Sequence, residues 1–332
     1  MNILILSSNL LVFLILYFIL YKFSFKFNLF DTFSKRKSHE GTIPLIGGIL
    51  IYLTSLITLF IFYNNFKIDN LLILIFIVSF IFVILGIIDD IGSISPYKRL
   101  LIQIIAIGLI INSGLSIKEL SSDSLNFDLK IIGYIFTILC LLTIINAFNF
   151  IDGIDGFCSI NFLITIISIN IYLGNLFDNT LILIIIINVI IFIIFNLGFI
   201  SSIKIFLGDN GSTFLGFFLG CYLIYLNQFN LIDSFFIPWL ITIPFYDMCR
   251  VILFRIKNKI NPTTPDRIHI HHILLNKFKN NILVLVFLSI ISLSFTIFGY
   301  FISNFSSIFS LILFVIFFLI YNYFLNNFNK SN

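Results

Sequence analysis

Two adjacent carboxylates stand in the segment IIDDIGSISPYKR, where Asp89 and Asp90 directly follow the apolar range 71–88. An ionised carboxylate costs several kcal/mol inside a lipid bilayer. An acidic pair at the edge of an apolar segment is therefore either the start of a solvated loop or part of a working site. The other polar motifs of the chain favour a working site.

Three more aspartates occur in motifs of the same kind. Asp152 and Asp155 belong to NAFNFIDGIDG (146–156), and Asp209 belongs to FLGDNGS (206–212). Any one of them could simply cap a helix, but several together indicate a shared site. Carboxylates without paired cysteines suit Mg²⁺ or Mn²⁺ better than zinc. Because phosphates need both metal and basic groups, nearby Lys and Arg residues favour phosphate chemistry.

A histidine cluster lies in the segment PDRIHIHH (265–272), which contains His269, His271 and His272. There is no H-E-x-x-H pattern and no cysteine partner, so a zinc site is not favoured. Imidazoles near neutral pH can bind phosphate or sugar oxygens or donate protons. A plain interfacial cluster remains the alternative.

Two further local patterns have structural interpretations. Asp247 and Arg250 are three residues apart within one apolar range, which predicts a buried ion pair on one helix face. The backbone N–H groups of Gly211 and Ser212 stand at the predicted start of another helix, a position that suits an anion. The isolated Cys residues predict neither a disulfide nor a metal site.

The composition requires these motifs to be positioned by membrane helices. The chain is 60% hydrophobic and 10% charged, with a mean hydropathy of +1.13, which excludes an ordinary soluble domain. About 20 apolar residues span a bilayer as a helix. The sequence predicts an all-α, polytopic integral membrane protein of about eleven transmembrane helices, forming a single domain over residues 1–332. The predicted spans are 3–21, 44–63, 71–88, 100–116, 131–148, 157–174, 180–197, 212–228, 235–256, 281–302 and 305–325.

The first span is predicted to be a helix and not a signal peptide, since no Lys or Arg precedes it and no small-residue cleavage site follows it.

The basic residues favour one orientation. Of the 19 Lys and Arg residues, only Lys67, Lys118 and Lys130 lie in connections after even-numbered spans. Cytoplasmic loops are enriched in Lys and Arg. We therefore expect the N-terminus outside, the C-terminus in the cytoplasm, and the polar motifs together on the cytoplasmic face of the plasma membrane.

The order of motifs resembles a known family. RKSHEGTIPLIGG (36–48), DD (89–90), NAFNFIDGIDG, FLGDNGSTFLGF (206–217) and PDRIHIHH resemble the polyprenyl-phosphate N-acetylhexosamine-1-phosphate transferases of the WecA, TagO and MraY type. The first and last motifs look closest to the WecA branch. Thr263–Thr264 and Asn210 depart from the family's usual residues, and neither departure removes a metal-type ligand.

The resemblance implies an Mg²⁺-dependent (or Mn²⁺-dependent) glycosyl-1-phosphate transferase in polysaccharide biosynthesis. It would move an N-acetylhexosamine-1-phosphate, first of all GlcNAc-1-phosphate, from a UDP-sugar to undecaprenyl phosphate and release UMP. The partners are then UDP-N-acetylhexosamine, undecaprenyl phosphate and membrane lipid, with no nucleic acid and with homodimer formation left open.

The resemblance also implies residue roles. Asp209 is the leading Mg²⁺ ligand, Asp89 and Asp90 organise the metal or the lipid phosphate, and His271 completes the catalytic set. Asp89 is also a candidate to take the proton of the lipid phosphate. The residues expected to bind substrate are Lys37, Arg99, Asn149, Asp152, Asp155, Asn196, Arg267, His269 and His272.

Two alternatives remain. A MraY-type transferase would use a UDP-muramoyl-pentapeptide donor. A transporter would carry its acids inside the helices and show paired repeats, whereas here the acids lie at the ends of the apolar ranges and no repeat is visible.

Overall fold

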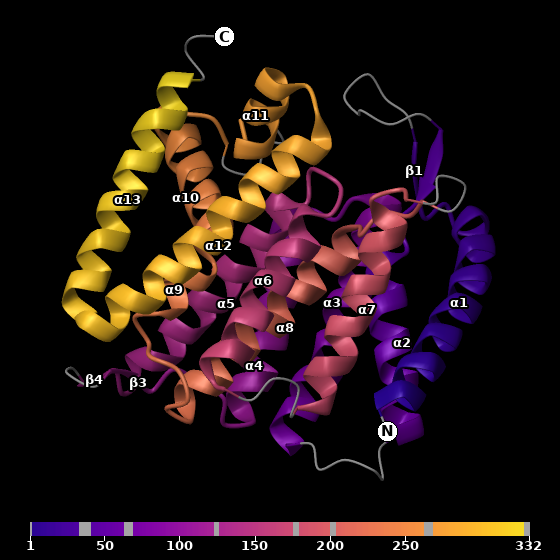
Figure 1. Cartoon of the computed structure of the whole chain (residues 1–332), viewed down its shortest axis with the longest axis horizontal. Coiled ribbons are helices and arrows are strands. Elements are labelled where there is room, and N and C mark those ends of the chain that lie inside the picture. Colours follow the sequence, from indigo (N-terminus) through magenta and orange to yellow (C-terminus); the bar gives the residue numbers. More distant parts are fainter. Residues whose placement is uncertain are drawn as a thin grey trace.

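The computed structural model describes residues 2–32, 41–62, 69–122, 126–174, 179–199, 204–261 and 268–328. This part of the chain is a bundle of helices with two short strand pairs (Figure 1). The helices are α1 (Asn2–Lys26), α2 (Gly47–Phe62), α3 (Asn70–Gly92), α4 (Pro96–Asn112), α5 (Ile132–Ile151), α6 (Phe157–Tyr172), α7 (Thr180–Asn196), α8 (Asp209–Gln228), α9 (Ile237–Leu240), α10 (Thr242–Lys257), α11 (Ile270–Phe278), α12 (Asn281–Phe305) and α13 (Ser307–Phe328).

The strands form two separate antiparallel pairs. β1 (Phe30–Thr32) pairs with β2 (Thr42–Pro44), and β3 (Glu119–Ser121) pairs with β4 (Asn126–Asp128). None of these strands was predicted from the sequence. Each is only three residues long, which is too short for an alternating pattern to stand out.

Several described helices have the length and composition of membrane spans, so this is an all-α, multi-pass membrane protein. Five qualify by length and hydropathy, and three shorter ones are also apolar. The five are Leu6–Lys26, Asn70–Gly92, Ile132–Ile151, Asn281–Phe305 and Ser307–Asn326. Each predicted apolar range overlaps a helix, but the number of helices that cross the membrane stays a prediction.

One predicted span is broken. The range 235–256 contains α9 and α10, which are separate at Ile241. Pro244 has no N–H, so it cannot donate to the carbonyl of Leu240 four residues earlier. The hydroxyl of Thr165 on α6 donates to that carbonyl instead, at 2.8 Å. The break is thus a proline effect repaired by a neighbouring helix.

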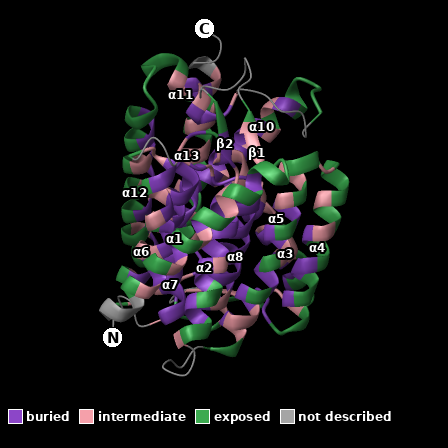
Figure 2. Cartoon of the chain, turned by 90° about the vertical axis from the view of Figure 1, so that its right-hand side faces the viewer, coloured by how far each residue is buried: buried purple, intermediate pink, exposed green. Residues whose placement is uncertain are grey.

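Helix α8 is the centre of the bundle, in contact with α2, α3, α5 and α6. Its residues 210–224 are all buried, and Figure 2 shows the buried residues gathered around it while α4 and α12 carry exposed faces. Gly86 of α3 allows the closest approach, because a Cβ there would lie 2.2 Å from the Asn210 backbone. The start of α8 is therefore held tightly against α3.

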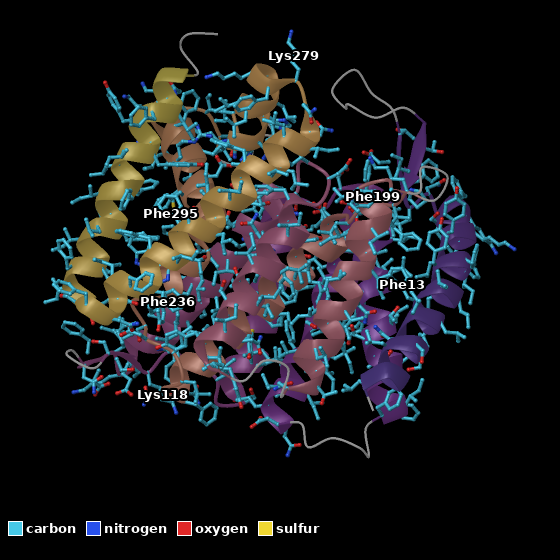
Figure 3. The ribbon with its side chains drawn as sticks, viewed as in Figure 1. Phe13, Lys118, Phe199, Phe236, Lys279 and Phe295 are labelled. Carbon is cyan, nitrogen blue, oxygen red and sulfur yellow. The ribbon has the colours of Figure 1, made fainter. Side chains whose placement is uncertain are left out.

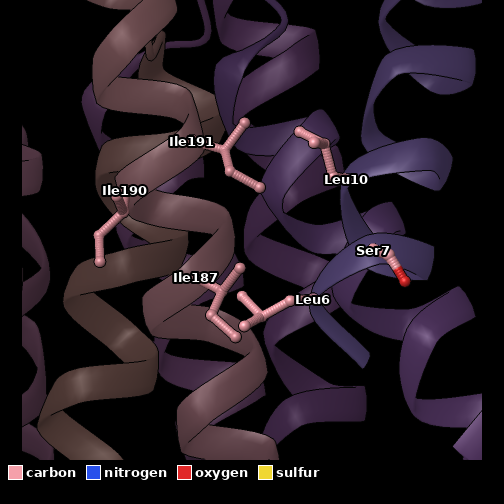
Figure 4. A pocket seen from close by; sticks show the side chains of 6 residues that line it. All are labelled: Leu6, Ser7, Leu10, Ile187, Ile190 and Ile191. Atoms are coloured by element: carbon pink, nitrogen blue, oxygen red, sulfur yellow. The ribbon is translucent and has the colours of Figure 1, made fainter. Parts of the chain in front are cut away.

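The outward faces of the described helices are apolar, as expected for contact with lipid. Large exposed side chains include Ile105 on α4, Ile135 on α5 and Phe301 on α12. A shallow hollow of about 430 Å³ lies between α1 and α7 (Figure 4). Its lining is Leu6, Ser7, Leu10, Ile187, Ile190 and Ile191, which includes no predicted site residue.

The two ends of the bundle differ. One end carries α11 and the β1–β2 pair, and we call it the polar end; the other carries β3 and β4 (Figure 1). Lys279 and Lys118 mark the polar end and the opposite end respectively (Figure 3). The start of α1 and the end of α13 also lie at opposite ends of the bundle.

Candidate functional site

The framework of the site is a backbone pairing between two segments far apart in the sequence. The N–H of Phe206 donates to the carbonyl of Pro44 at 2.9 Å, and the N–H of Gly47 donates back to Phe206 at 2.9 Å. The N–H of Gly48 donates to Leu207 at 3.1 Å. These bonds join the start of α2 to the segment before α8, so IPLIGG and FLGDNGS meet at the polar end.

Asp89, near the end of α3, faces a basic residue of the next helix. Its Oδ2 accepts a hydrogen bond from Nη1 of Arg99 at 3.1 Å, and its Oδ1 accepts from the N–H of Ile94 at 2.7 Å. The Arg99 guanidinium also reaches Oδ1 of Asn146 on α5, at 3.5 Å. The sequence singled out Arg99 but missed Asn146, which lies one helical turn before Asn149.

Asp90 points in another direction. Its Oδ1 accepts from the N–H of Asp209 at 2.9 Å, and its Oδ2 accepts from the N–H of Asn210 at 3.2 Å. The side-chain amide of Asn210 donates to the same Oδ2 at 2.6 Å. Adjacent carboxylates on α3 therefore have different surroundings.

Asp209 is the first residue of α8, and its carboxylate lies among groups from α3 and α5. Its Oδ1 accepts from the amide of Asn149 at 2.7 Å, and that amide also reaches the hydroxyl of Ser212 at 3.1 Å. The Asp89 carboxyl is close enough to Asp209 to interact with it directly, and Arg99 also acts on it. Asp89, Arg99, Asn149 and Asp209 thus form one cluster.

Asp152 follows α5 and completes the acidic site. Removal from water and then the neighbouring carboxylates of Asp209, Asp90 and Asp155 raise the pKa of Asp152 well above its ordinary value. Asp152 therefore belongs to the same electrostatic environment as the other acids. They come from three different regions of the chain, as the sequence led us to expect.

The second half of the IDGIDG loop is held by two further residues. Asp155 Oδ2 pairs with Nζ of Lys204 at 2.6 Å. Buried Asn196, at the end of α7, accepts from the N–H of Gly156 at 2.6 Å and donates to the carbonyl of Ile205 at 2.9 Å. Asn196 thus holds the loop to the segment before α8. Lys204 was not among the predicted site residues.

His271 is packed over this loop, with 1% of its surface exposed. Neither ring nitrogen has a hydrogen-bond partner among the described residues. A Cβ on Gly153 would lie 2.0 Å from Nε2 of His271, so a glycine is needed for the imidazole to occupy this place. Burial, followed by the neighbouring His272, lowers the pKa of His271 well below its ordinary value. The ring is therefore neutral at physiological pH.

His269 belongs to a separate cluster around Asp247. Its Nδ1 lies 2.8 Å from Oδ2 of Asp247, and Arg250 Nη2 lies 3.0 Å from Oδ1. The side chains of Asp247 and Arg250 are fully buried, which confirms the predicted ion pair. The N–H of Ile270 and the hydroxyl of Tyr321 also donate to Asp247, at 2.9 and 3.4 Å. This cluster anchors the start of α11.

The histidine segment contains a helix that the sequence did not predict. α11 begins at Ile270 and is only nine residues long, too short for a membrane span. The ring of His272 lies 4.2 Å from that of His271, centroid to centroid. The predicted substrate contacts Lys37 and Arg267 lie outside the described residues.

One local prediction was wrong. The N–H groups of Gly211 and Ser212 were expected to face an anion, but both donate to the carbonyl of Gly208, at 3.0 Å each. The preceding N–H groups, of Asp209 and Asn210, are the ones that meet an anion, and that anion is Asp90. The four cysteines are free, as predicted.

The acidic residues fit a hard divalent cation. Within the described ranges, no three His, Cys, Asp or Glu side chains form a ready-made metal cage. Mg²⁺ usually needs no such cage, because it takes one or two carboxylates and completes its shell with water and substrate phosphates. Asp89 and Asp209 offer an all-oxygen pair of like charges that a cation would neutralise.

Fold and site together define a polytopic membrane protein with a carboxylate-rich centre at one end of its helices. The family model described as "Glycosyl transferase family 4" matches residues 72–227. The undecaprenyl-phosphate alpha-N-acetylglucosaminyl 1-phosphate transferase of Yersinia pestis is 30% identical, over 83% of this chain and 78% of that protein. The chain belongs to glycosyl transferase family 4.

Two other relatives have similar names. The Escherichia coli K12 transferase of the same name is 31% identical over 83% of this chain and 78% of its own length. A probable undecaprenyl-phosphate N-acetylglucosaminyl 1-phosphate transferase of Bacillus subtilis is 31% identical over 80% of this chain and 74% of its length.

Proposed function

We propose that this protein transfers GlcNAc-1-phosphate from UDP-N-acetylglucosamine to undecaprenyl phosphate and releases UMP. The observation that carries the proposal is the cluster of Asp89, Arg99, Asn149 and Asp209 at one end of a membrane bundle. A site at the end of membrane helices can meet a lipid phosphate and a soluble nucleotide at once. Relatives across 83% of the chain carry this activity in their names.

The reaction exchanges one phosphoryl linkage for another. A phosphate oxygen of undecaprenyl phosphate forms a bond to the β-phosphorus of the UDP-sugar, and the bond between that phosphorus and the oxygen bridging to the α-phosphate breaks. The bridging oxygen leaves with UMP, and the lipid carries a pyrophosphoryl sugar. Because phosphoryl transfer depends on positioning and charge stabilisation, the protein must hold two anionic substrates together.

Asp209 and Asp89 would hold Mg²⁺ or Mn²⁺ in this reaction. The cation supplies neutralisation of the diphosphate and of the charge on departing UMP. Asn149 keeps the Asp209 carboxylate in one orientation through its 2.7 Å hydrogen bond. Asp89 would also accept the acceptor phosphate's proton, and its Oδ2 pairs with Nη1 of Arg99 at 3.1 Å.

Basic and neutral donors would bind the remaining phosphate and sugar oxygens. Arg99 is half-buried and forms two polar contacts through its side chain within the described part of the chain, and further N–H groups of its guanidinium would bind a lipid phosphate. Neutral His271 has two ring nitrogens without a partner in the part of the chain that the structure describes, one able to donate and one able to accept. That pair suits a sugar hydroxyl or a phosphate oxygen.

The test is a transfer assay with purified protein, undecaprenyl phosphate and Mg²⁺. We expect UDP-N-acetylglucosamine to yield UMP and a lipid-linked sugar, with turnover abolished by EDTA and restored by Mg²⁺ or Mn²⁺. Preference for UDP-muramoyl-pentapeptide would instead indicate the MraY-type reaction. A protein that is folded and yields no UMP from any UDP-N-acetylhexosamine would refute the proposal.

The proposed orientation has the N-terminus outside, the C-terminus in the cytoplasm, and the polar end facing the cytoplasm of a bacterial plasma membrane. The support is the distribution of Lys and Arg along the sequence. Single cysteines replacing exposed Lys118 and Lys279, at opposite ends of the bundle, provide the test (Figure 3). In a background without the native cysteines, a membrane-impermeant thiol reagent should label position 118 in intact cells and spare position 279. The reverse pattern would invert the topology.

A further inference from the structure

The start of α8 is capped by a side chain from another helix. The N–H groups of Asp209 and Asn210 donate to Oδ1 and Oδ2 of Asp90, at 2.9 and 3.2 Å. The first N–H groups of a helix have no partner within the helix, and negative charge is stabilised beside them. Asp90 of α3 therefore acts as the N-terminal cap of α8.

Asn210 reinforces this cap. Its Nδ2 donates to Asp90 Oδ2 at 2.6 Å and to the carbonyl of Leu45 at 2.9 Å. Its Oδ1 accepts from the N–H of Ile49 at 3.0 Å. The side chain is completely buried. A single amide thus ties together the end of α3, the start of α2 and the start of α8.

The hydrogen bonds of Asp90 leave little capacity for other partners. A carboxylate offers about four acceptor positions, and three donors from residues 209 and 210 already fill most of those on Asp90. Counting only the described residues, Asp89 instead has one donor on each oxygen and interacts directly with the Asp209 carboxyl. The neighbouring acids are therefore suited to different tasks.

We infer that Asp90 and Asn210 are a positioning pair, which fixes the start of α8 so that Asp209 meets Asp89, and that Asp90 is not itself a ligand of the cation. This replaces the metal-binding role that the sequence predicted for Asp90. The inference rests on the proposed function, in which Asp209 lies in the reacting site. Its first test nevertheless needs no turnover.

That first test compares thermal unfolding of purified protein in detergent, with and without Mg²⁺. Asp90→Asn should lower the Mg²⁺-free Tm by on the order of 2–6 °C, as expected when a helix cap is lost. It should retain the Mg²⁺-dependent rise in Tm that ligand binding produces. Asp209→Asn should show the reverse, with the Mg²⁺-free Tm unchanged or higher and the rise abolished. An unchanged Mg²⁺-free Tm together with a lost Mg²⁺ response in Asp90→Asn would overturn the inference.

A second test asks whether the pair acts as one unit in turnover. Asp90→Asn and Asn210→Ala should each reduce kcat about 10–100-fold, the usual effect of residues that orient metal ligands. The double variant should be no slower than the slower single variant, because both changes release the same helix start. The concentration of Mg²⁺ that gives half-maximal rate should change less than kcat. Multiplied losses in the double variant would show independent roles and contradict the pair.

Asn188→Ala is the matched control. Asn188 is also a fully buried amide, which accepts from Asn9 at 2.9 Å and donates to Ser55 at 2.8 Å. It lies about 12 Å along α7 from Asn196, at a rise of about 1.5 Å per residue. This variant should lower Tm while kcat and the Mg²⁺ response of the folded protein stay as in the wild type. If wild-type protein fails to turn over UDP-N-acetylglucosamine, the proposed function fails, while the Tm comparison still decides the role of Asp90.

Discussion

Two buried acidic regions of this protein use the same side chain in opposite ways. Asp247 is surrounded by donors: the Arg250 guanidinium, the His269 imidazole, a backbone N–H and the Tyr321 hydroxyl. Asp209 accepts from the amide of Asn149 and lies beside other carboxylates. The first region neutralises its charge within the chain, whereas the second gathers carboxyl groups that oppose one another's ionisation.

The difference separates a supporting site from a reacting one. A buried ion pair whose carboxylate is surrounded by donors holds a local structure, here the start of α11. A set of like charges destabilises the folded chain unless a cation joins it, and such perturbed groups gather at functional sites. Stability and activity should therefore respond differently to changes in the two regions.

The largest effect is expected for Asp209→Asn. The change keeps the side-chain volume but removes charge from the proposed cation site, so kcat should fall about 10²–10³-fold. Because the change also relieves repulsion among carboxylates, Tm without Mg²⁺ should not fall. UMP release and thermal unfolding measure the two quantities, and near-normal turnover would exclude Asp209 from the cation site.

Asp247→Asn should show the opposite behaviour. Removal of the charge leaves the Arg250 guanidinium buried without a counter-charge, which typically destabilises a protein by about 3–5 kcal/mol. The double variant Asp247→Asn/Arg250→Gln should recover part of this loss, since no uncompensated charge remains. Thermal unfolding of the three proteins gives the comparison. A single variant as stable as the wild type would mean that the cluster does not support α11.

Gly153→Ala tests His271, which follows His269 of the first region in the sequence and packs over a loop of the second region. The added methyl group would occupy the place of Nε2, so the imidazole must leave the loop, and we expect kcat to fall about 10–100-fold, as when a supporting shell is disturbed. Gly108→Ala is the matched control, because a Cβ there meets nothing within 4 Å. It should leave turnover unchanged. Equal kcat values for both glycine variants would argue against a role for His271.

A smaller effect concerns pH. In the folded protein the pKa of His271 is well below its ordinary value. As the pH falls, the unfolded chain therefore takes up a proton on this imidazole before the folded protein does. The stabilisation that comes from burying the neutral imidazole is therefore complete above about pH 6.5. Below that value it is lost as the pH falls, and the free energy of unfolding decreases by up to about 1.4 kcal/mol per pH unit. In Tm measurements between pH 7.5 and 5.5, His271→Gln should decline less steeply than the wild type. Equal slopes would contradict this assignment.

The sequence predicted the helices better than their contacts. Long apolar ranges specify membrane helices by composition, and the i, i+3 spacing of Asp247 and Arg250 was enough to predict their ion pair. Local patterns could not show that Asp90 caps a helix 119 residues further along the chain, or that Asn210 reaches Leu45. Such contacts depend on how the helices pack, as does the place of His271 over Gly153.

The acids of the site were predictable as a group because they stand at the ends of apolar ranges, in connections predicted to face the same side of the membrane. Their individual surroundings were not. Asp89 and Asp90 are neighbours in sequence, yet the helix turns their side chains by about 100° relative to each other, one toward Arg99 and the other toward α8. The sequence likewise did not indicate a site role for Lys204, because its pairing with Asp155 joins the loops before α6 and after α7.

The opposite placement of the start of α1 and the end of α13 limits how this chain can be rearranged. In the proposed orientation a short peptide could not join the two points without crossing the bilayer, so a circular permutant or a head-to-tail tandem copy would need an additional hydrophobic helix as its linker. With the proposed orientation, reporter domains fused at the two points would likewise occupy different compartments. An engineered version of this protein has to respect that polarity.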